Sequence, residues 1–257
     1  MINNFDANKG FFNELTKVIS GTSVSRFFGW IRDISTTDLF GASVFNDIFI
    51  ICLKIPNLFR RFFAEGAFNQ AFVPLYAEYQ EKKDDLQTKE FLNAISGTLI
   101  FTLFIFTLVV LTFAPIFIFL FAPGFYFDPI KQDISVLVLR IMFPYLALIS
   151  LVALAGGIQN THQKFSLPAL TPVIFNLSLI VAALFIAPHY DMPLYVLAWS
   201  VLLAGLLQLV IQIAPLRSIK RLPTPKINFN NKGIKKFLVV IFPAILAGGI
   251  IQINLLV

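Results

Sequence analysis

Residues 25–74 read SRFFGWIRDISTTDLFGASVFNDIFIICLKIPNLFRRFFAEGAFNQAFVP. This stretch is apolar enough to lie in a membrane, yet it carries nine ionisable side chains. They are Arg26, Arg32, Asp33, Asp38, Asp47, Lys54, Arg60, Arg61 and Glu65. Ionisable groups at bilayer depth are costly, so they usually face a protein interior or a water-filled cavity. The stretch therefore predicts two charged membrane helices that turn their polar sides inward.

The composition of the whole chain also indicates a membrane protein. Its 257 residues are 57% hydrophobic and 13% charged, with a mean hydropathy of +0.80, whereas soluble domains are about 25% charged. The single cysteine, Cys52, excludes a disulfide within the chain and a cysteine-based metal site. The sequence contains no Ser-His-Asp set, phosphate loop or HExxH motif. We therefore expect no enzyme activity, no metal or cofactor and no nucleic-acid partner.

Long uncharged runs predict the membrane spans. A helix needs about 20 apolar residues to cross the hydrocarbon core, and the runs here are too long for barrel strands of about 10 alternating residues. The fold class is therefore all-α, a polytopic helical membrane protein. The expected helices are at about 18–40, 45–72, 91–121, 134–158, 167–187, 192–214 and 236–257. The first two would score poorly in a hydropathy scan because of their charges.

These spans divide the chain into three parts. Residues 1–215 are expected to form an N-terminal transmembrane lobe of six helices, and residues 216–235 a basic connector. Residues 236–257 are expected to begin a second lobe. Because this last apolar run stops at Val257 without a flanking basic or aromatic anchor, we expect a truncated chain.

The distribution of basic residues predicts the orientation. With the N-terminus in the cytoplasm, 13 of the 20 Lys and Arg residues fall in cytoplasmic segments, and only Lys131 falls in an opposite loop. Cytoplasmic loops of membrane proteins carry an excess of Lys and Arg. The chain is therefore predicted to be a multi-pass protein with a cytoplasmic N-terminus and a cytoplasmic connector.

The second span carries a charged stripe. Asp47, Lys54 and Arg61 are spaced by seven residues, which places them on one side of a helix. Glu65, four residues past Arg61, continues the stripe. The residues that flank it are Asn57 and Arg60, and those of the opposite face are Phe49, Ile55, Phe59 and Phe63. Pro56 removes a helix hydrogen bond, so a kink near Lys54 is expected.

The first span supplies Ser25, Arg26, Gly29, Arg32 and Asp33. Arg26, Gly29 and Asp33 fall on one face, whereas Arg32 lies about 120° from Arg26 on a straight helix. A bend or close packing at Gly29 would bring the two arginines together.

Two interpretations of these charges remain open. In the structural one, Arg32 pairs with Asp33 or Asp47, while Arg60 and Arg61 extend to the headgroups. In the functional one, the cations line a cavity for an anionic substrate, because guanidinium groups match phosphate oxygens in bidentate fashion. The cations of that cavity would be Arg26, Arg32, Lys54 and Arg61.

Several motifs of the chain match those of a known family. They are Ser25-Arg26, Gly29, Arg32-Asp33, Leu39-Phe40-Gly41, Asp47, Lys54-Ile55-Pro56-Asn57-Leu58, Arg60-Arg61, Ala64-Glu65-Gly66-Ala67-Phe68 and Gln70-Ala71-Phe72-Val73-Pro74, followed by Ala122-Pro123-Gly124-Phe125, Phe143-Pro144-Tyr145, Pro168-Ala169, Pro172 and Asn176. With this set the sequence resembles the MurJ (MviN) lipid II flippases over essentially its whole length.

The resemblance implies two pseudo-symmetric lobes around a central cavity, as in the multidrug and oligosaccharide-lipid exporters. It implies movement of the lipid-linked peptidoglycan precursor from the inner to the outer leaflet of the bacterial cytoplasmic membrane by alternating access. Membrane lipids and cell-wall synthesis proteins would be further partners. The substrate-binding residues expected from the charges and the resemblance together are Arg26, Arg32, Asp47, Lys54, Arg60 and Arg61, with Ser25, Gly29, Asp33, Asn57 and Glu65 in support.

The sequence also departs from the family pattern. Family members have a complete second lobe with a further cavity arginine, and position 38 is Asp where a basic residue is common. We therefore expect the chain not to flip lipid on its own. The alternatives are a cation-coupled drug or oligosaccharide-lipid exporter of the same superfamily and a membrane scaffold without transport activity.

Overall fold

The computed structural model describes the backbone of residues 2–254 and the side chains of residues 21–61, 63, 64 and 66–244. Over this range the chain is helical and forms no strand, which confirms the all-α class. The elements are α1 (Ile2–Phe40), α2 (Val44–Arg60), η1 (Arg61–Glu65), α3 (Ala67–Lys82), α4 (Asp85–Thr112), α5 (Ala114–Phe121), α6 (Pro123–Tyr126), α7 (Pro129–Met142), α8 (Tyr145–Thr161), α9 (Ser166–Val181), η2 (Ala182–Ile186), η3 (Ala187–His189), α10 (Pro193–Ser218) and α11 (Lys232–Asn254).

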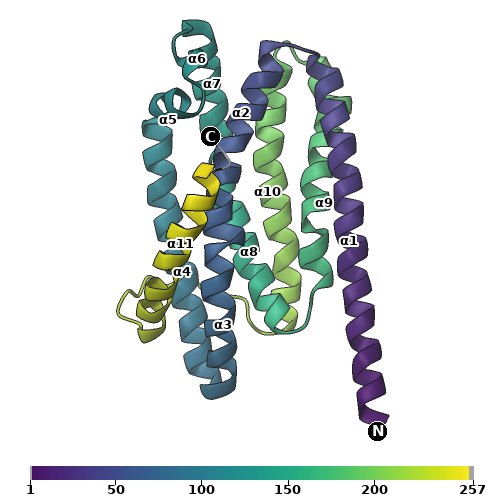
Figure 1. Cartoon of the computed structure of the whole chain (residues 1–257), viewed down its shortest axis with the longest axis vertical. Helices are drawn as coiled ribbons and strands as arrows, with labels where there is room; N and C mark the ends of the chain where they lie inside the picture. The colour runs from purple at the N-terminus through teal and green to yellow at the C-terminus, as the bar shows by residue number, and fades with distance from the viewer. Residues whose placement is uncertain (1, 255–257) are drawn as a thin grey trace.

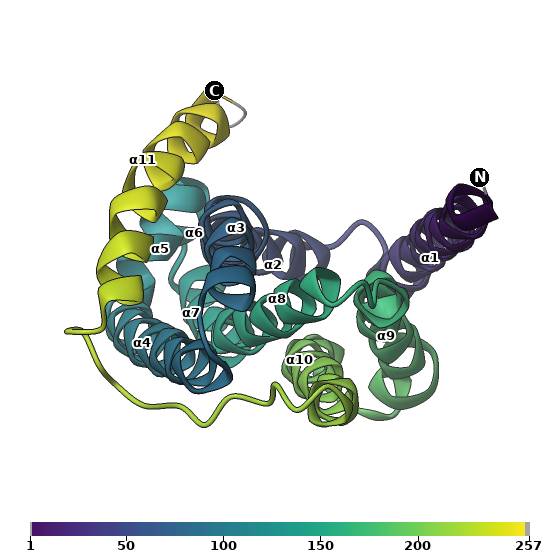
Figure 2. The ribbon, with the colours of Figure 1, turned by 90° about the horizontal axis from the view of Figure 1, so that it is seen from below.

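The helices run up and down in one bundle (Figure 1). Helix α1 packs along α9, α10 packs on α8 and α9, and α2 packs on α7. Seen from below, α1 and α11 lie on opposite sides of the molecule, with α2 and α3 between them (Figure 2). Because α1 barely touches α2, its neighbour in the sequence, the charged face of α2 is left uncovered by the described elements.

Four helical segments of the described residues are long and apolar enough to cross a membrane: Asp85–Thr112, Pro129–Thr161, Ser166–His189 and Pro193–Ser218. The charged spans expected at 18–40 and 45–72 are not among them. They lie within α1 and within the successive elements α2, η1 and α3. The charges of these two elements explain why length and hydropathy alone do not single them out.

Prolines interrupt two of the expected spans. The helix expected at 91–121 is two helices, α4 and α5, which meet at Phe113. Pro115 has no N–H to donate to the carbonyl of Leu111, so the helix ends there. The Leu111 carbonyl instead accepts a hydrogen bond from Nε of Arg140 at 3.0 Å. The helix expected at 134–158 is likewise divided into α7 and α8 at Phe143 and Pro144.

The second span contains an irregularity that was not predicted. Helix α2 continues through Pro56, and the α-helical pattern gives way at η1, a π-helical turn that is followed by Gly66. The side chain of Glu65, a predicted supporting residue, lies outside the described residues.

The connections alternate between the two ends of the bundle (Figure 1). The start of α1, the α3–α4 turn, the α8–α9 loop and the end of α10 lie at one end. The turn from α1 to α2, the segment from α5 to α7 and the connection from α9 to α10 lie at the other end. The predicted basic connector begins later than expected, because α10 extends to Ser218, and it ends earlier, because α11 begins at Lys232.

Candidate functional site

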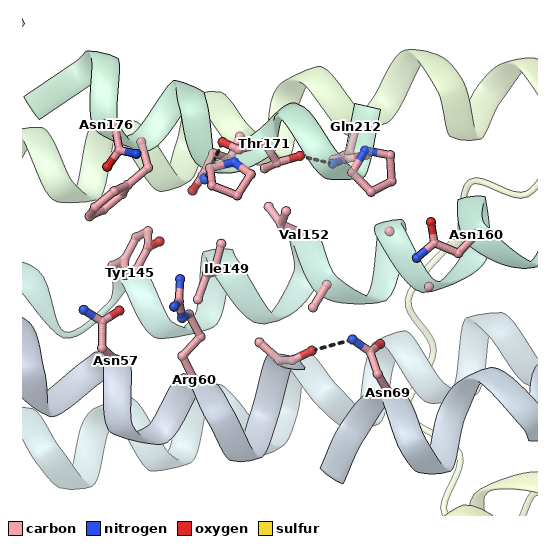
Figure 3. Close-up of a pocket in the computed structure, with 18 of the residues that line it drawn as sticks. Asn57, Arg60, Asn69, Tyr145, Ile149, Val152, Asn160, Thr171, Asn176 and Gln212 are labelled. Atoms are coloured by element: carbon pink, nitrogen blue, oxygen red, sulfur yellow. Dashed lines mark hydrogen bonds between the residues drawn. The ribbon is translucent and has the colours of Figure 1, made fainter. Parts of the chain in front are cut away.

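A cavity of about 360 Å³ lies inside the bundle. Its lining residues come from α1, α2, η1, α3, α8, α9 and α10, so it is a product of the tertiary structure rather than of any one helix. Figure 3 shows these side chains converging on it, with α8 between the helix that carries Asn57 and Arg60 and the helices that carry Thr171, Asn176 and Gln212.

Arg32 brings a cation from α1 to this cavity. Its Nη1 donates to Oδ1 of Asn176 on α9 at 2.9 Å, and its Nη2 lies 2.6 Å from Oδ1 of Asp33. Its guanidinium carbon lies 5.9 Å from the ring centre of Phe175, within the range of a cation–π contact. These contacts hold the charge in place. Because the Arg32 side chain is still 23% exposed and lines the cavity, the charge remains accessible.

Arg60 brings a second cation from the end of α2. It is half-buried and lines the cavity together with Asn57 and Ala64 of the same side of the helix. Figure 3 shows Arg60 reaching from α2 toward α8, beside Ile149 and Tyr145. Since an arginine keeps its proton in proteins, the cavity contains two permanent positive groups.

Uncharged polar side chains form the rest of the polar lining. They are Asn57, Asn69, Tyr145, Asn160, Thr171, Asn176, Gln208 and Gln212. Gln212 Nε2 donates to Oγ1 of Thr171 at 2.9 Å, and Gln208 Nε2 donates to the Thr171 carbonyl at 2.9 Å. Gln159 of α8 donates to Oε1 of Gln212. This polar network links α8, α9 and α10 within the membrane-spanning part of the bundle.

The structure gathers three of the predicted site residues, Arg32, Asn57 and Arg60, around one cavity. Ser25 and Gly29 are half-buried, and the Ser25 carbonyl accepts a hydrogen bond from Asn176 Nδ2 at 3.0 Å. Helix α1 is continuous through Gly29, and a Cβ at this position would lie 3.6 Å from Nδ2 of Asn176, so α1 packs against α9 here.

The other predicted side chains whose positions are described lie outside the cavity lining. Those with exposed side chains are Arg26, Asp33, Asp47, Lys54 and Arg61. The heptad stripe therefore faces outward, while the opposite face of α2 is buried as expected at Phe49 and Ile55. Arg60, one residue from the stripe, points about 100° away from Arg61, and it is the arginine that reaches the cavity.

Of the cavity amides, only Asn57 was predicted as a site residue. The prediction weighed charged groups, and Asn176, Gln208 and Gln212 lie in spans without any charge. A signal was nevertheless present, because Gln208 and Gln212 are four residues apart and so lie on one face of an otherwise apolar helix. Two glutamines on one face of a membrane helix indicate a polar interior.

A helical membrane bundle that contains a cavity with cationic and amide groups has the architecture of a lobe of a membrane transporter. Comparison with known proteins identifies the family. The family described as lipid II flippase MurJ matches residues 36–257, and this chain belongs to it.

Individual relatives give the same result. The chain is 42% identical over 236 residues to a protein of Buchnera aphidicola subsp. Acyrthosiphon pisum named probable lipid II flippase MurJ, covering 92% of this chain and 46% of the relative. It is 38% identical over 250 residues to the lipid II flippase MurJ of Burkholderia cenocepacia, covering 96% and 48%. A solved structure, lipid II flippase MurJ in an inward closed conformation, superimposes with a TM-score of 0.77 at 28% identity, covering 93% and 49%.

The chain thus spans about half the length of these relatives. The resemblance inferred from the motifs is confirmed. Family and fold together make the chain part of a multi-pass protein of the bacterial inner membrane.

Proposed function

We propose that this chain forms the N-terminal lobe of a lipid II flippase, which moves the lipid-linked peptidoglycan precursor from the inner to the outer leaflet by alternating access. The observation that carries the proposal is the presence of two arginines, Arg32 and Arg60, in one cavity of an apolar bundle. The names of the relatives support the same substrate.

The chemistry of the two arginines suits a pyrophosphate. A cation in a membrane-spanning bundle is costly unless it meets an anion or hydrogen-bond acceptors. Asn176 accepts one hydrogen bond from Arg32, and the carboxylate of Asp33 is 66% exposed, so solvent screening weakens this ion pair. A pyrophosphate group in the cavity offers several acceptor oxygens to both guanidinium groups.

The outward-facing charges belong to a second part of the proposed site. Arg26, Asp47, Lys54 and Arg61 lie on faces of α1 and α2 that the described elements leave exposed. The long relatives have a further half that this chain does not match. We propose that these residues face that half across the central pathway, with the N-terminus in the cytoplasm.

A chimera tests the proposal. This chain would replace the matching half of the Burkholderia cenocepacia relative in a flippase-depleted bacterium. Arg32→Ala and Arg60→Ala should each abolish growth and weaken binding of lipid II by about tenfold or more, as expected for the loss of a charge-assisted hydrogen bond.

Arg217→Ala is the matched control, because Arg217 is exposed at the end of α10 and outside the cavity. It should leave growth unchanged. Normal growth of both cavity variants at an undiminished protein level would refute the proposal and favour a structural role for the charges.

A further inference from the structure

We propose that Gln208 and Asn69 form an acceptor subsite in this cavity, which binds the hydroxyl and amide N–H groups of a lipid-linked sugar. The inference rests on the proposed function and assigns a second part of the substrate to the same cavity. It would give the cavity two chemically distinct ends, one for the phosphates and one for the sugar.

Gln208 presents a buried acceptor without a partner among the described residues. Its side chain is 2% exposed and lines the cavity. Its Nε2 donates to the carbonyl of Thr171 at 2.9 Å, while its Oε1 makes no hydrogen bond. The Thr171 carbonyl accepts but cannot donate, so its partner must be the amide nitrogen of Gln208. The atom left without a partner is therefore the amide oxygen, Oε1.

Asn69 repeats this arrangement on the other side of the cavity. Its Nδ2 donates to the carbonyl of Ala64 at 2.9 Å, and its Oδ1 is buried without a described partner. The same reasoning fixes its amide, so a second residue of the cavity lining has a buried acceptor oxygen without a described partner.

The neighbouring hydrogen bonds prevent these amides from rearranging among themselves. Oγ1 of Thr171 donates to the carbonyl of Leu167 at 3.0 Å, so it must accept from Gln212. Oε1 of Gln212 then accepts from Gln159. The hydrogen bonds of the network thus fix the orientation of these amides, and none of them is donated to Gln208 Oε1.

A buried acceptor is costly when unpaired and requires a donor. A phosphate has only acceptor oxygens at neutral pH, so it is disfavoured next to Gln208 and Asn69 and favoured next to Arg32 and Arg60. Sugar hydroxyls and acetamido N–H groups are donors and fit the acceptor end. Figure 3 places Arg60 and Asn57 toward one end of the cavity, and Asn69, Asn160 and Gln212 toward the other.

The test compares two lipids binding to the full chain in nanodiscs. One is lipid II, and the other is undecaprenyl pyrophosphate, which has the phosphates but no sugar. Gln208→Met removes one of the two acceptors at similar side-chain volume. It should weaken binding of lipid II about fivefold, the effect of one lost hydrogen bond, and leave binding of undecaprenyl pyrophosphate unchanged.

Gln159→Met is the matched control. Gln159 belongs to the same network and is 1% exposed, and its Oε1 also has no described partner, but it does not line the cavity. It should affect both lipids equally or neither. A selective loss of lipid II binding in this variant would show that the network acts only through packing, and would overturn the subsite.

The remaining outcomes separate the two proposals. If neither lipid binds the unaltered chain saturably, the proposed function fails and the subsite fails with it. If both lipids bind with equal affinity and Gln208→Met changes neither, the phosphate site stands, whereas the two acceptors bind water and the subsite is refuted.

Discussion

At the scale of single residues, one asparagine organises the cationic end of the cavity. The Oδ1 of Asn176 accepts from Arg32 while its Nδ2 donates to the carbonyl of Ser25. The opposite amide orientation would place an N–H group against a cation and a carbonyl against a carbonyl, so it is excluded. Asn176 therefore joins α1 to α9 and positions the Arg32 charge in the same step.

A second residue-scale feature lies at the end of α8. Nε2 of His162 lies 2.7 Å from Nε2 of Gln80 and 3.1 Å from the hydroxyl of Tyr76. With the Gln80 amide donating, Nε2 accepts and the imidazole is neutral. Burial, and then the positive charges of Arg221 and Lys164, hold the pKa of His162 below its usual 6.5.

This depressed pKa predicts a pH-dependent stability. The unfolded chain binds a proton more readily than the folded one, so acid costs stability. The loss begins as the pH falls below about 6.5, the unfolded pKa, and is complete below the lower folded pKa. Thermal unfolding at pH 7.5 and 5.5 should show a smaller acid shift in His162→Gln than in the unaltered chain. An identical shift in the two proteins would contradict this role for His162.

At the scale of elements, the π-helical turn η1 positions the end of α2. The N–H of Gly66 donates to the carbonyl of Arg61 at 2.8 Å, and Asn69 holds the carbonyl of Ala64. Such turns are frequent at functional sites because they re-aim side chains within a helix. Here the turn directly follows Arg60 and includes Ala64, both of which line the cavity.

Gly66→Ala should therefore disrupt this turn. A Cβ at position 66 would lie 2.6 Å from the Arg61 carbonyl oxygen, which is closer than real side chains approach. We expect a loss of about 1–3 kcal/mol in unfolding free energy and weaker lipid II binding. Gly124→Ala, where a Cβ meets open space, is the control for thermal unfolding and binding, and equal behaviour of the two variants would rule out the steric argument.

At the scale of the whole molecule, the segment after α10 ties the end of the bundle together. The N–H of Lys226 donates to the carbonyl of Asn93 at 2.9 Å, and the N–H of Thr224 donates to Oδ1 of the same residue at 2.8 Å. Arg221 pairs with Asp85. The segment thus crosses the N-terminal part of α4 before α11 packs against α3. A movement of α11 would therefore be transmitted to this part of α4.

Gly97→Val should release this segment. A Cβ at position 97 would lie 2.4 Å from the carbonyl carbon and oxygen of Lys226, so the backbone must move away from α4. Trypsin should then cleave after Lys220 or Lys226 faster than in the unaltered chain, because cleavage requires an extended, detached backbone. Gly156→Ala, whose Cβ would make an ordinary 3.6 Å contact with Pro168, serves as the control, and unchanged cleavage in Gly97→Val would contradict the tight crossing.

The sequence by itself determined the all-α membrane class, the family and the amphipathic character of α2. These follow from hydropathy, spacing and motifs, which are local properties of the chain. It also predicted Arg32, Asn57 and Arg60, which line the cavity, because ionisable and polar groups stand out in apolar spans.

Only the tertiary structure decided which face of each helix is internal. The heptad rule groups Asp47, Lys54 and Arg61 on one stripe of α2, which the described elements leave exposed, whereas Arg60 lines the cavity inside the bundle. The amides of α8, α9 and α10 form a site only because three apolar helices bring them together. A single helix shows that two residues share a side, but what that side faces depends on every helix packed around it.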